Sequence, residues 1–353
     1  MIEDDLRAAF ARREELTPAV GPVRIAIDRA VVRRRRRRFR LRLAGTALAV
    51  VAAALAGFTA VAPGPPESAH LLGAPATPAT PAPSGAMNVL LLGLDQAGGG
   101  RRADSVLLVH VPADRSRLYL VSLPRDLLVP VPGRGTDKLN ATFTAGAGPA
   151  GTDLAAGYRS TRQVVAQLTG VRIDAGAVLT YGATRELTDA VGGVPICLPA
   201  TVRSHHTHRT YPAGCQRLDG AAAVDVLRQR YGMPDGGLDR DRNAGRYAAG
   251  LLTRIREQGV LTNPVLLNRL ISQAGSGLVT DTGETSLLTL LAVAGKAATV
   301  DPVAVGLPVR YPEKEPYGFR LDPALAPGFL DALRGDRLGE WTAAHPKQVT
   351  ALR

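Results

Sequence analysis

The sequence predicts an α/β domain in which a mixed central sheet is flanked by helices in three layers, preceded by one transmembrane helix. Three observations favour this prediction. Short apolar runs separated by Gly-rich or charged turns begin after Met87, as expected of buried strands. Segments with helical patterning then alternate with further strands, which is typical of layered α/β folds. Finally, twenty uncharged residues run from Leu43 to Ala62.

The apolar run from Leu43 to Ala62 follows directly on a cluster of arginines. As a helix rising about 1.5 Å per residue, it would cross roughly 30 Å of hydrocarbon. Residues 1–42 hold 13 arginines against six acidic residues, and eight of these arginines lie between Arg33 and Arg42. The positive-inside rule therefore predicts a cytoplasmic basic tail at 1–42 and a signal anchor at 43–62. We expect a single-pass cell-membrane protein whose C-terminal domain is extracytoplasmic.

A cleaved signal peptide is the alternative interpretation of the apolar run. Ala60, Val61 and Ala62 have the small-x-small form of a cleavage site. We favour an anchor because more than forty residues precede the run and Pro63 would follow the cut.

The formal net charge of +12 is unevenly distributed. Residues 1–42 carry +7 of it, which leaves +5 for the remaining 311 residues. Arginines next to a membrane segment act as a topology signal and contact lipid headgroups. We therefore expect a membrane partner and no nucleic acid. The alternative is a membrane-tethered regulator that touches DNA through these arginines.

Composition divides the rest of the chain. Residues 63–86 are rich in Pro, Ala, Thr and Gly, which predicts an extended linker. We expect a folded domain at 87–310 and a C-terminal extension at 311–353, packed on or beyond that domain. The core must be built mainly from Leu, Val and Ala, because aromatic residues make up only 4% of the chain.

Apolar patterning sets the elements expected within these boundaries. Expected strands lie at 88–94, 105–112, 117–124, 177–180 and 194–198, and expected helices at 153–168, 184–191, 220–229, 239–258, 264–274, 285–298 and 324–334.

The two cysteines, Cys197 and Cys215, both lie in the part of the chain expected outside the cell. An oxidising compartment favours a disulfide between two thiols that close a short loop, with a stabilisation of about 3 kcal/mol. Two unpaired, buried thiols are the alternative.

Two carboxylates border the Gly-rich segment GLDQAGGGRRADS. Asp95 ends one expected strand and Asp104 opens the next. Oxygen ligands of this kind suit Mg²⁺, or Mn²⁺, bound together with phosphate oxygens. The alternative is turn chemistry, because Asp next to Gly is common where strands end.

Basic residues follow the next expected strand, in VSLPRDLLVPVPG and TDKLNATF. Pro124 fixes Arg125 at the strand end, where its guanidinium could present two parallel donors to a phosphate. Lys138 and Asn140 could add a charge and an amide donor near the same point. The alternative is a surface pair between Arg125 and Asp126.

The segment LRQRYGMPDGGLDRDRNAGR is rich in arginine. Arg228 and Arg230 project the same way if this stretch is extended, and Arg240 opens an expected helix close to Asp239. Guanidiniums converging at a helix start would form an anion site suited to pyrophosphate. A solvated run of charges is the alternative.

Seven segments in order resemble the signature blocks of the LytR-CpsA-Psr family across residues 87–250: MNVLLLGLD, RADSVLLV, VSLPRD, DKLNATF, AVGGVPICLP, LDGAAAVDVLRQR and LDRDR. The resemblance implies a mixed α/β domain that holds a polyprenyl pyrophosphate lipid with its tail in an apolar cleft. It also implies the transfer of a phosphate-linked glycopolymer from that carrier to peptidoglycan.

The resemblance assigns roles position by position. Asp95 and Asp104 match the acidic pair near the metal ion. The pyrophosphate-binding residues are expected to be Arg125, Lys138, Arg228, Arg230 and Arg240, and the catalytic residues Arg125, Arg240 and Asp239.

Three positions depart from the family pattern. Members usually have Asp, Arg and Gln where this chain has Gly237, Asn243 and Ala244. Asp235 or Asp239 could replace the missing carboxylate. The alternative function is therefore an impaired member that binds the lipid or the glycopolymer without transferring it.

Other motifs favour no further enzyme class. His205, His206 and His208 could ligate a metal or form an extracytoplasmic loop whose charge follows pH, and we favour the loop because no carboxylate cluster completes a site. The sequence contains no GxSxG, HExxH or GxxxxGK[ST] motif.

Overall fold

A computed structural model describes residues 70–71, 84–95, 102–283, 290, 293, 295–312 and 317–353. All of them belong to one compact unit, Pro65–Arg353. The predicted cytoplasmic tail, the predicted membrane segment and most of the predicted linker lie outside the described residues. Among the residues described, no helix combines the length and the apolar composition that a membrane span requires.

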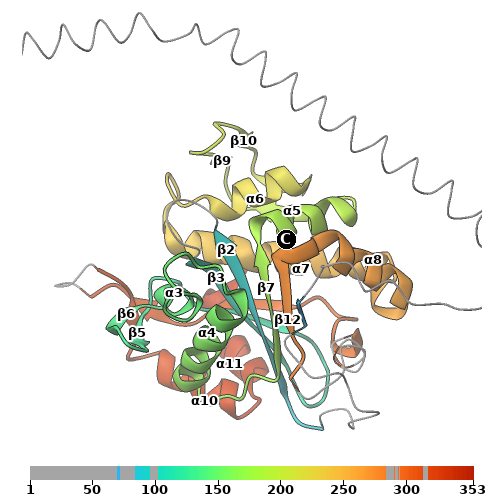
Figure 1. Cartoon of the computed structure of the whole chain (residues 1–353). Coiled ribbons are helices and arrows are strands. Elements are labelled where there is room, and N and C mark those ends of the chain that lie inside the picture. Colours follow the sequence, from blue (N-terminus) through green and yellow to red (C-terminus); the bar gives the residue numbers. More distant parts are fainter. Residues whose placement is uncertain are drawn as a thin grey trace, which may run out of the picture. The chain divides into compact units, whose positions relative to one another are not determined.

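A mixed sheet forms the centre of the fold (Figure 1). The eight strands described in this sheet are, in spatial order, β1 (His70–Leu71), β12 (Leu278–Asp281), β7 (Ala175–Thr180), β2 (Met87–Asp95), β3 (Arg102–Val111), β4 (Tyr119–Ser122), β13 (Val303–Gly306) and β16 (Val349–Thr350). Neighbours pair in parallel for β1–β12, β7–β2 and β4–β13, and antiparallel elsewhere.

Helices and smaller hairpins surround this sheet. The helices are α3 (Ala141–Ala147), α4 (Leu154–Thr169), α5 (Tyr181–Ala190), α6 (Gly220–Arg228), α7 (Gly237–Glu257), α8 (Pro264–Ala274), α10 (Ala326–Arg334) and α11 (Leu338–Ala344). The smaller pairs are β5 (Leu128–Val131) with β6 (Gly135–Lys138), β8 (Val194–Leu198) with β11 (Gly214–Leu218), β9 (Val202–Arg203) with β10 (Thr210–Tyr211), and β14 (Val309–Arg310) with β15 (Arg320–Leu321).

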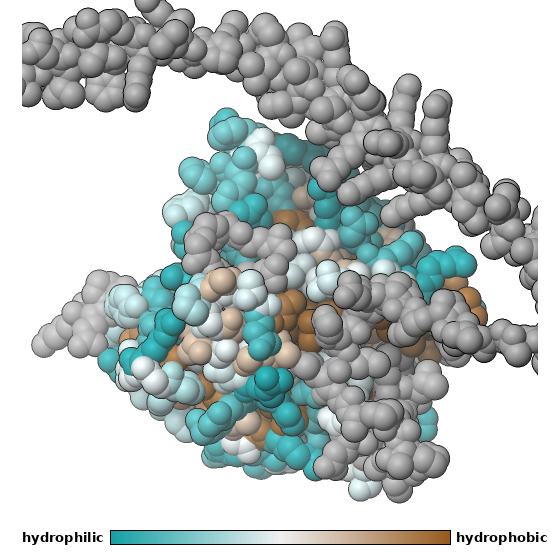
Figure 2. All heavy atoms as spheres, viewed as in Figure 1, coloured by the Kyte–Doolittle hydropathy of each residue, from teal (hydrophilic) through white to brown (hydrophobic). Residues whose placement is uncertain are grey.

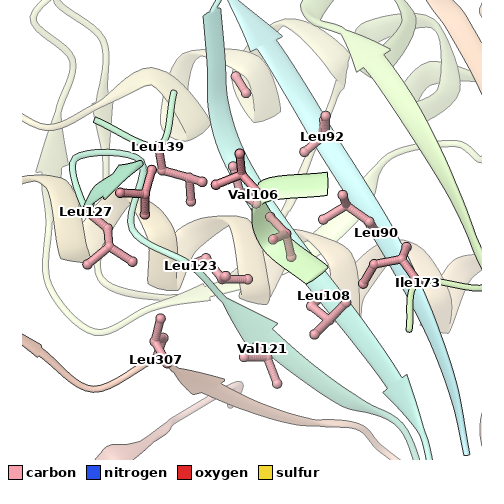
Figure 3. Packing of buried hydrophobic residues seen from close by; sticks show 14 of the residues in the cluster. Leu90, Leu92, Val106, Leu108, Val121, Leu123, Leu127, Leu139, Ile173 and Leu307 are labelled. Carbon is pink, nitrogen blue, oxygen red and sulfur yellow. The ribbon is translucent and has the colours of Figure 1, made fainter. Parts of the chain in front are cut away.

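The central strands are apolar on both faces, which explains why their sequences read as continuous runs. Leu92 of β2 and Leu108 of β3 lie in the largest core cluster (Figure 3), which also holds residues of α3, α4 and α10. Leu107 and Leu120 pack instead with Ala249 of α7. Because successive side chains of a strand point to opposite faces, the sheet is covered on both sides. The predicted three-layer arrangement of a mixed sheet between helices is confirmed.

Capping side chains explain where several helices begin. Asp153, Thr180 and Asp219 precede α4, α5 and α6, and each side chain accepts a hydrogen bond from a backbone N–H in the first turn. Helix α7 follows Gly236 instead, without a side-chain cap.

The face seen in Figure 2 is mostly hydrophilic, with small apolar patches between the polar residues.

The predicted elements agree closely with the structure. The strand at 194–198 and the helix at 264–274 have the predicted bounds, and the other helices shift by a few residues at their ends. The helix predicted at 285–298 lies mostly outside the described residues. The sequence did not indicate helices α3 and α11, the β5–β6, β9–β10 and β14–β15 pairs, or strands β1, β11, β12, β13 and β16.

The C-terminal residues are part of the packing of this domain. Phe329, Leu333 and Trp341, from α10 and α11, lie in the largest core cluster. Strand β16 then pairs antiparallel with β13 and forms one edge of the described sheet.

The predicted disulfide is confirmed. Cys197 of β8 and Cys215 of β11 are direct cross-strand partners, with Cα atoms 3.8 Å apart, and they are bonded to each other. The alternative of two unpaired thiols is wrong, because the antiparallel register places the two side chains opposite each other.

Replacing both Cys197 and Cys215 with Ala should lower the free energy of unfolding by about 3 kcal/mol, because the bond restricts the unfolded chain across 18 residues. Denaturant unfolding of the full chain in detergent would measure this loss. Dithiothreitol should weaken the parent protein and leave the double variant unchanged. Equal stability of parent and variant would contradict the prediction.

Candidate functional site

A β-bulge places Asp104 at the end of the sheet. In the pairing of β2 with β3, Gly93 lies opposite Ser105 and Leu94 lies opposite Ala103, so Asp104 is the additional residue. A bulge of this kind re-aims a side chain out of the regular alternation of a strand. Asp104 is buried and accepts a short hydrogen bond from Nη1 of Arg125.

The turn that carries Arg125 follows β4 and is held by backbone hydrogen bonds. The N–H of Leu127 donates to the carbonyl of Pro124 (3.0 Å), and the N–H of Asn140 donates to the carbonyl of Arg125 (3.0 Å). Pro124 and these bonds fix the backbone position from which the Arg125 side chain extends. The segment before α3, which contains Lys138 and Asn140, thus lies against this turn, as the sequence suggested.

Arg125, Asp126 and Lys138 form a connected group of charges. Nε of Arg125 lies 3.4 Å from Oδ2 of Asp126, and Nζ of Lys138 lies 3.1 Å from Oδ1 of the same carboxylate. Burial raises the pKa of Asp126, but the charges of Arg125, Lys138 and Arg240 outweigh this effect, so its pKa lies below the ordinary carboxyl value. Arg240 is therefore within electrostatic reach of this group.

Arg240 lies in the first turn of α7 and is 4% exposed. Its Nη2 is 3.5 Å from Oδ1 of Asp241, a long contact, and its buried Nε has no hydrogen-bond partner among the described residues. A buried guanidinium nitrogen without an acceptor is costly unless a ligand supplies one. This nitrogen is the strongest sign of an anion site at this end of the domain.

Arg228 and Asp95 approach each other on the other side of the site. Nη2 of Arg228 lies 3.9 Å from Oδ1 of Asp95, and its guanidinium carbon is 5.6 Å from the centre of the Tyr181 ring. Arg230 is exposed and lies on Tyr231, 4.7 Å from the ring centre. The extended stretch from which Arg228 and Arg230 would project the same way does not form, because Arg228 is the last residue of helix α6.

Tyr181 connects the two sides, and sequence reasoning missed it. Strands β2 and β7 are parallel neighbours with Leu94 opposite Thr180, so Asp95 and Tyr181 emerge at the same end of the sheet. Burial raises the pKa of the Tyr181 phenol, the carboxylates of Asp104 and Asp95 raise it further, and Arg240 and Arg228 oppose them. The sequence offered one signal for Tyr181, which is its position directly after a buried strand. Ligands often bind where the carboxyl ends of parallel strands meet.

An apolar cavity of about 110 Å³ lies next to these charges, between the sheet and helices α5 and α7. Arg240 and Tyr181 line it together with Leu91, Leu179 and Leu251. The site therefore combines a cluster of charged groups with an apolar pocket. This combination suits an amphiphile whose polar end is anionic.

The three positions that depart from the family pattern differ in their surroundings. A Cβ atom added to Gly237 would lie 3.7 Å from Oδ2 of Asp126, so the carboxylate of Asp126 already occupies the neighbouring space. Ala244 lines the apolar cavity. Asn243 is fully buried and accepts a hydrogen bond from Arg246 (2.9 Å), which also donates to the carbonyl of Ala351.

Both carboxylate oxygens of Asp239 have partners near the start of α7. Its Oδ1 lies 2.6 Å from Nη1 of Arg242, and its Oδ2 accepts a hydrogen bond from the N–H of Asp235 (2.8 Å). Both oxygens of Asp239 are thus held by the helix start, and Arg242 also pairs with Asp235 (2.6 Å).

The histidine-rich stretch joins β9 to β10. Asp225 of α6 holds this loop, because its carboxylate accepts hydrogen bonds from Ser204 (2.6 Å), Thr207 and Tyr211 (2.7 Å). The ring of His205 lies 5.0 Å from that of Tyr231. No group of three or more metal-binding side chains occurs in the part of the chain that the structure describes.

The donor chemistry at Asp95 and Asp104 fits a hard divalent cation. Both carboxylates raise the pKa of the Tyr181 phenol, so both lie within electrostatic reach of this ring. Mg²⁺ is commonly held by one or two carboxylates, with phosphate and water oxygens completing its octahedron. Two acidic side chains beside an anion site meet that requirement.

Comparison with known proteins adds independent findings. A family model described as the LytR_cpsA_psr family matches residues 69–309. LcpB of Corynebacterium glutamicum, named a probable cell wall biosynthesis protein, is 36% identical over 176 residues, covering 50% of this chain and 40% of LcpB. TagU of Oceanobacillus iheyensis is named a polyisoprenyl-teichoic acid–peptidoglycan teichoic acid transferase. It is 28% identical over 213 residues, which cover 58% of this chain and 62% of TagU. The chain thus spans less than two thirds of each relative.

Solved structures share the fold. The LytR-Csp2A-Psr enzyme from Actinomyces oris superposes with a TM-score of 0.55 at 23% identity, over 75% of this chain and 96% of that one. A structure described as TagT bound to LI-WTA gives a TM-score of 0.54 at 20% identity. The superposition covers 71% of this chain and 90% of the TagT chain. At these identities the likeness shows the fold alone, which is the mixed α/β arrangement that the resemblance implied.

The buried carboxyl of Asp241 should make the free energy of unfolding depend on pH. Burial raises its pKa to about 7, and the charge of Arg240 opposes this rise. Because the folded pKa lies above the ordinary value of 3.8, the stability that protonated Asp241 contributes is complete below about pH 4 and is lost as pH rises to 7. Asp241→Asn should flatten the decline in unfolding free energy over this window, by at most about 4 kcal/mol.

Denaturant titrations of the full chain at pH 4.5, 6 and 7.5 (roughly spanning the window) would measure this difference. Asp331→Asn is the matched control, because the Asp331 side chain is 65% exposed. If Asp241→Asn and the parent show parallel pH profiles, the assigned titration is wrong.

Proposed function

Since this chain belongs to the LytR-CpsA-Psr family, we propose that it transfers a phosphate-linked glycopolymer from a polyprenyl pyrophosphate carrier to peptidoglycan during cell-wall assembly. The relatives support the general class of reaction, because TagU is named for the transfer of teichoic acid to peptidoglycan and LcpB for cell wall biosynthesis. The carrier lipid and the phosphate chemistry rest on the site described above.

One observation carries the proposal: the buried Nε of Arg240 has no acceptor among the described residues, and Arg240 lines an apolar cavity. A polyprenyl pyrophosphate offers both partners that this arrangement lacks. Its diphosphate oxygens would accept from Arg240, and the first part of its isoprenoid chain would enter the cavity beside Leu91 and Leu251. Ala244 leaves room at the cavity wall for this chain.

The other charged residues have proposed roles around the diphosphate. Arg125, which is paired with Asp104, and Arg228, which lies over Tyr181, would donate to its oxygens. Lys138, which is paired with Asp126, would add positive charge nearby. Arg230 would contribute from the rim by turning away from Tyr231. Mg²⁺ or Mn²⁺ held by Asp95 and Asp104 would supply further positive charge next to the phosphate oxygens.

The transfer is a displacement at phosphorus. A sugar hydroxyl of peptidoglycan attacks the phosphorus that bears the glycopolymer and a new P–O bond forms. The pyrophosphate bond breaks, polyprenyl phosphate leaves, and the hydroxyl proton passes to solvent. Arg125 and Arg240 would neutralise the charge that develops on the departing oxygen. Asp239 would contribute by fixing the start of α7, where Arg242 and the N–H of Asp235 hold its carboxylate.

The proposed location follows the same logic. With the segment at 43–62 as an anchor and the arginines before it in the cytoplasm, the domain would face the cell wall, where both substrates are exposed. The carrier lipid would reach the cavity from the membrane that holds the anchor.

The second candidate function is binding of the carrier lipid without transfer. It is favoured by Gly237 and Asn243, which stand where family members usually have Asp and Arg. Against it, Asp126 already places a carboxylate 3.7 Å from the Cβ position of Gly237. The two functions differ in turnover and not in lipid binding.

Full-length protein in detergent should release polyprenyl phosphate from a polyprenyl pyrophosphate-linked glycopolymer when Mg²⁺ and peptidoglycan are present. Arg125→Ala and Arg240→Ala should each lower this rate by about 100-fold, because each removes a donor to the developing charge. Mass spectrometry of the released lipid would measure the rate.

Arg172→Ala is the matched control, because the Arg172 side chain is 78% exposed and pairs with Asp174. Unchanged rates in both site variants would refute the site. Lipid binding without release by the parent protein would select the second candidate function instead.

A further inference from the structure

Two exposed aromatic side chains lie on the β14–β15 hairpin, beyond the segment that the family model matches. Tyr311 is 59% exposed and Tyr317 is 61% exposed. Single exposed apolar residues are common on protein surfaces, but two exposed aromatic rings on one short hairpin beside charged residues favour a binding surface. Figure 1 shows this hairpin beside β5 and β6, which follow the Arg125 turn in the chain.

Both rings are held in place although they face water. The Tyr311 ring lies 4.1 Å from the Phe319 ring, and Phe319 is only 2% exposed. The Tyr317 hydroxyl donates to Oδ1 of Asp137 (3.1 Å), and Nζ of Lys138 lies 4.8 Å from the centre of its ring. Rings fixed in this way lose little conformational entropy when a ligand stacks on them.

The hairpin is bonded directly to the turn that carries Arg125. The N–H of Phe319 donates to the carbonyl of Asp126 (2.9 Å), and the N–H of Leu128 donates to the carbonyl of Phe319 (2.9 Å). A Cβ atom on Gly318 would lie 2.6 Å from the carbonyl oxygen of Asp126, so only glycine allows this approach. Lys138 joins the two parts again, because it contacts both Tyr317 and Asp126.

We propose that Tyr311 and Tyr317 form a platform that binds a sugar ring of a glycan next to the phosphate-binding residues. The carbon-bound hydrogens on one face of a pyranose pack against an aromatic ring, and its hydroxyls can bond to groups such as Asp137 and Lys138. The proposal rests on the proposed function, which places a phosphate linked to a sugar at Arg125. A sugar attached to that phosphate would extend toward the neighbouring hairpin.

The sugar can come from either of two sources with the same chemistry. It can belong to the glycopolymer on the carrier lipid, or to the peptidoglycan that accepts the polymer. Isothermal titration of full-length protein in detergent can distinguish them with three probes: a phosphate-free oligosaccharide of the glycopolymer, a disaccharide fragment of peptidoglycan, and a polyprenyl pyrophosphate without sugar.

Tyr311→Ala and Tyr317→Ala should each weaken binding of one of the two sugar probes by about tenfold, because each removes an aromatic contact. Tyr311→Phe and Tyr317→Phe should retain most of this affinity, since the ring remains. Val265→Ala, on α8, is the surface control, because Val265 is 68% exposed and distant in sequence from the hairpin. Polyprenyl pyrophosphate should bind all of these variants equally well.

The third probe separates the two proposals. Failure of polyprenyl pyrophosphate to bind the parent protein would count against the proposed function and leave the sugar measurements to test the platform. The platform is refuted if neither sugar probe binds the parent protein, or if both alanine variants bind the sugars as the parent does. Weakening of one sugar probe alone identifies the source.

Discussion

The ion pair between Arg125 and Asp104 is the constraint on which the site depends. It joins a bulge in β3 to the turn after β4, and the same turn contacts Lys138 and the β14–β15 hairpin. Burying either charge alone would cost several kcal/mol, whereas together they compensate much of that cost. The bulge in β3 is therefore linked, through Arg125, to the turn after β4 and to the segments that this turn contacts.

Charge balance explains how so many arginines share one end of the sheet. Arg125 has Asp104, Arg228 approaches Asp95, and the charge of Arg240 acts on the carboxylate of Asp126. Tyr181 lies among these groups and contributes a neutral hydroxyl at the border of the apolar cavity. The fold thus gathers guanidiniums at one end of the sheet without accumulating the repulsion that unpaired like charges would cause.

Sequence patterning predicted the elements that depend on local signals. Apolar runs marked the central strands, and helical patterning marked helices such as the one predicted at 153–168. The position of Asp104 in the bulge could not be predicted, because a bulge depends on the pairing of two strands. Tyr181 was missed because its neighbours come from four separate segments, and the direction of Arg230 was misjudged because a helix ends two residues before it.

The antiparallel strand β16 has a consequence for any shortened form of this protein. Val349 and Thr350 cover the backbone of β13, and Arg246 of α7 bonds to the carbonyl of Ala351. A version cut at residue 309, where the matched family segment ends, would leave the N–H and C=O groups of β13 that now face β16 unpaired at a sheet edge. Such an edge recruits strands from other molecules, so the shortened protein would be prone to aggregate even with its site residues intact.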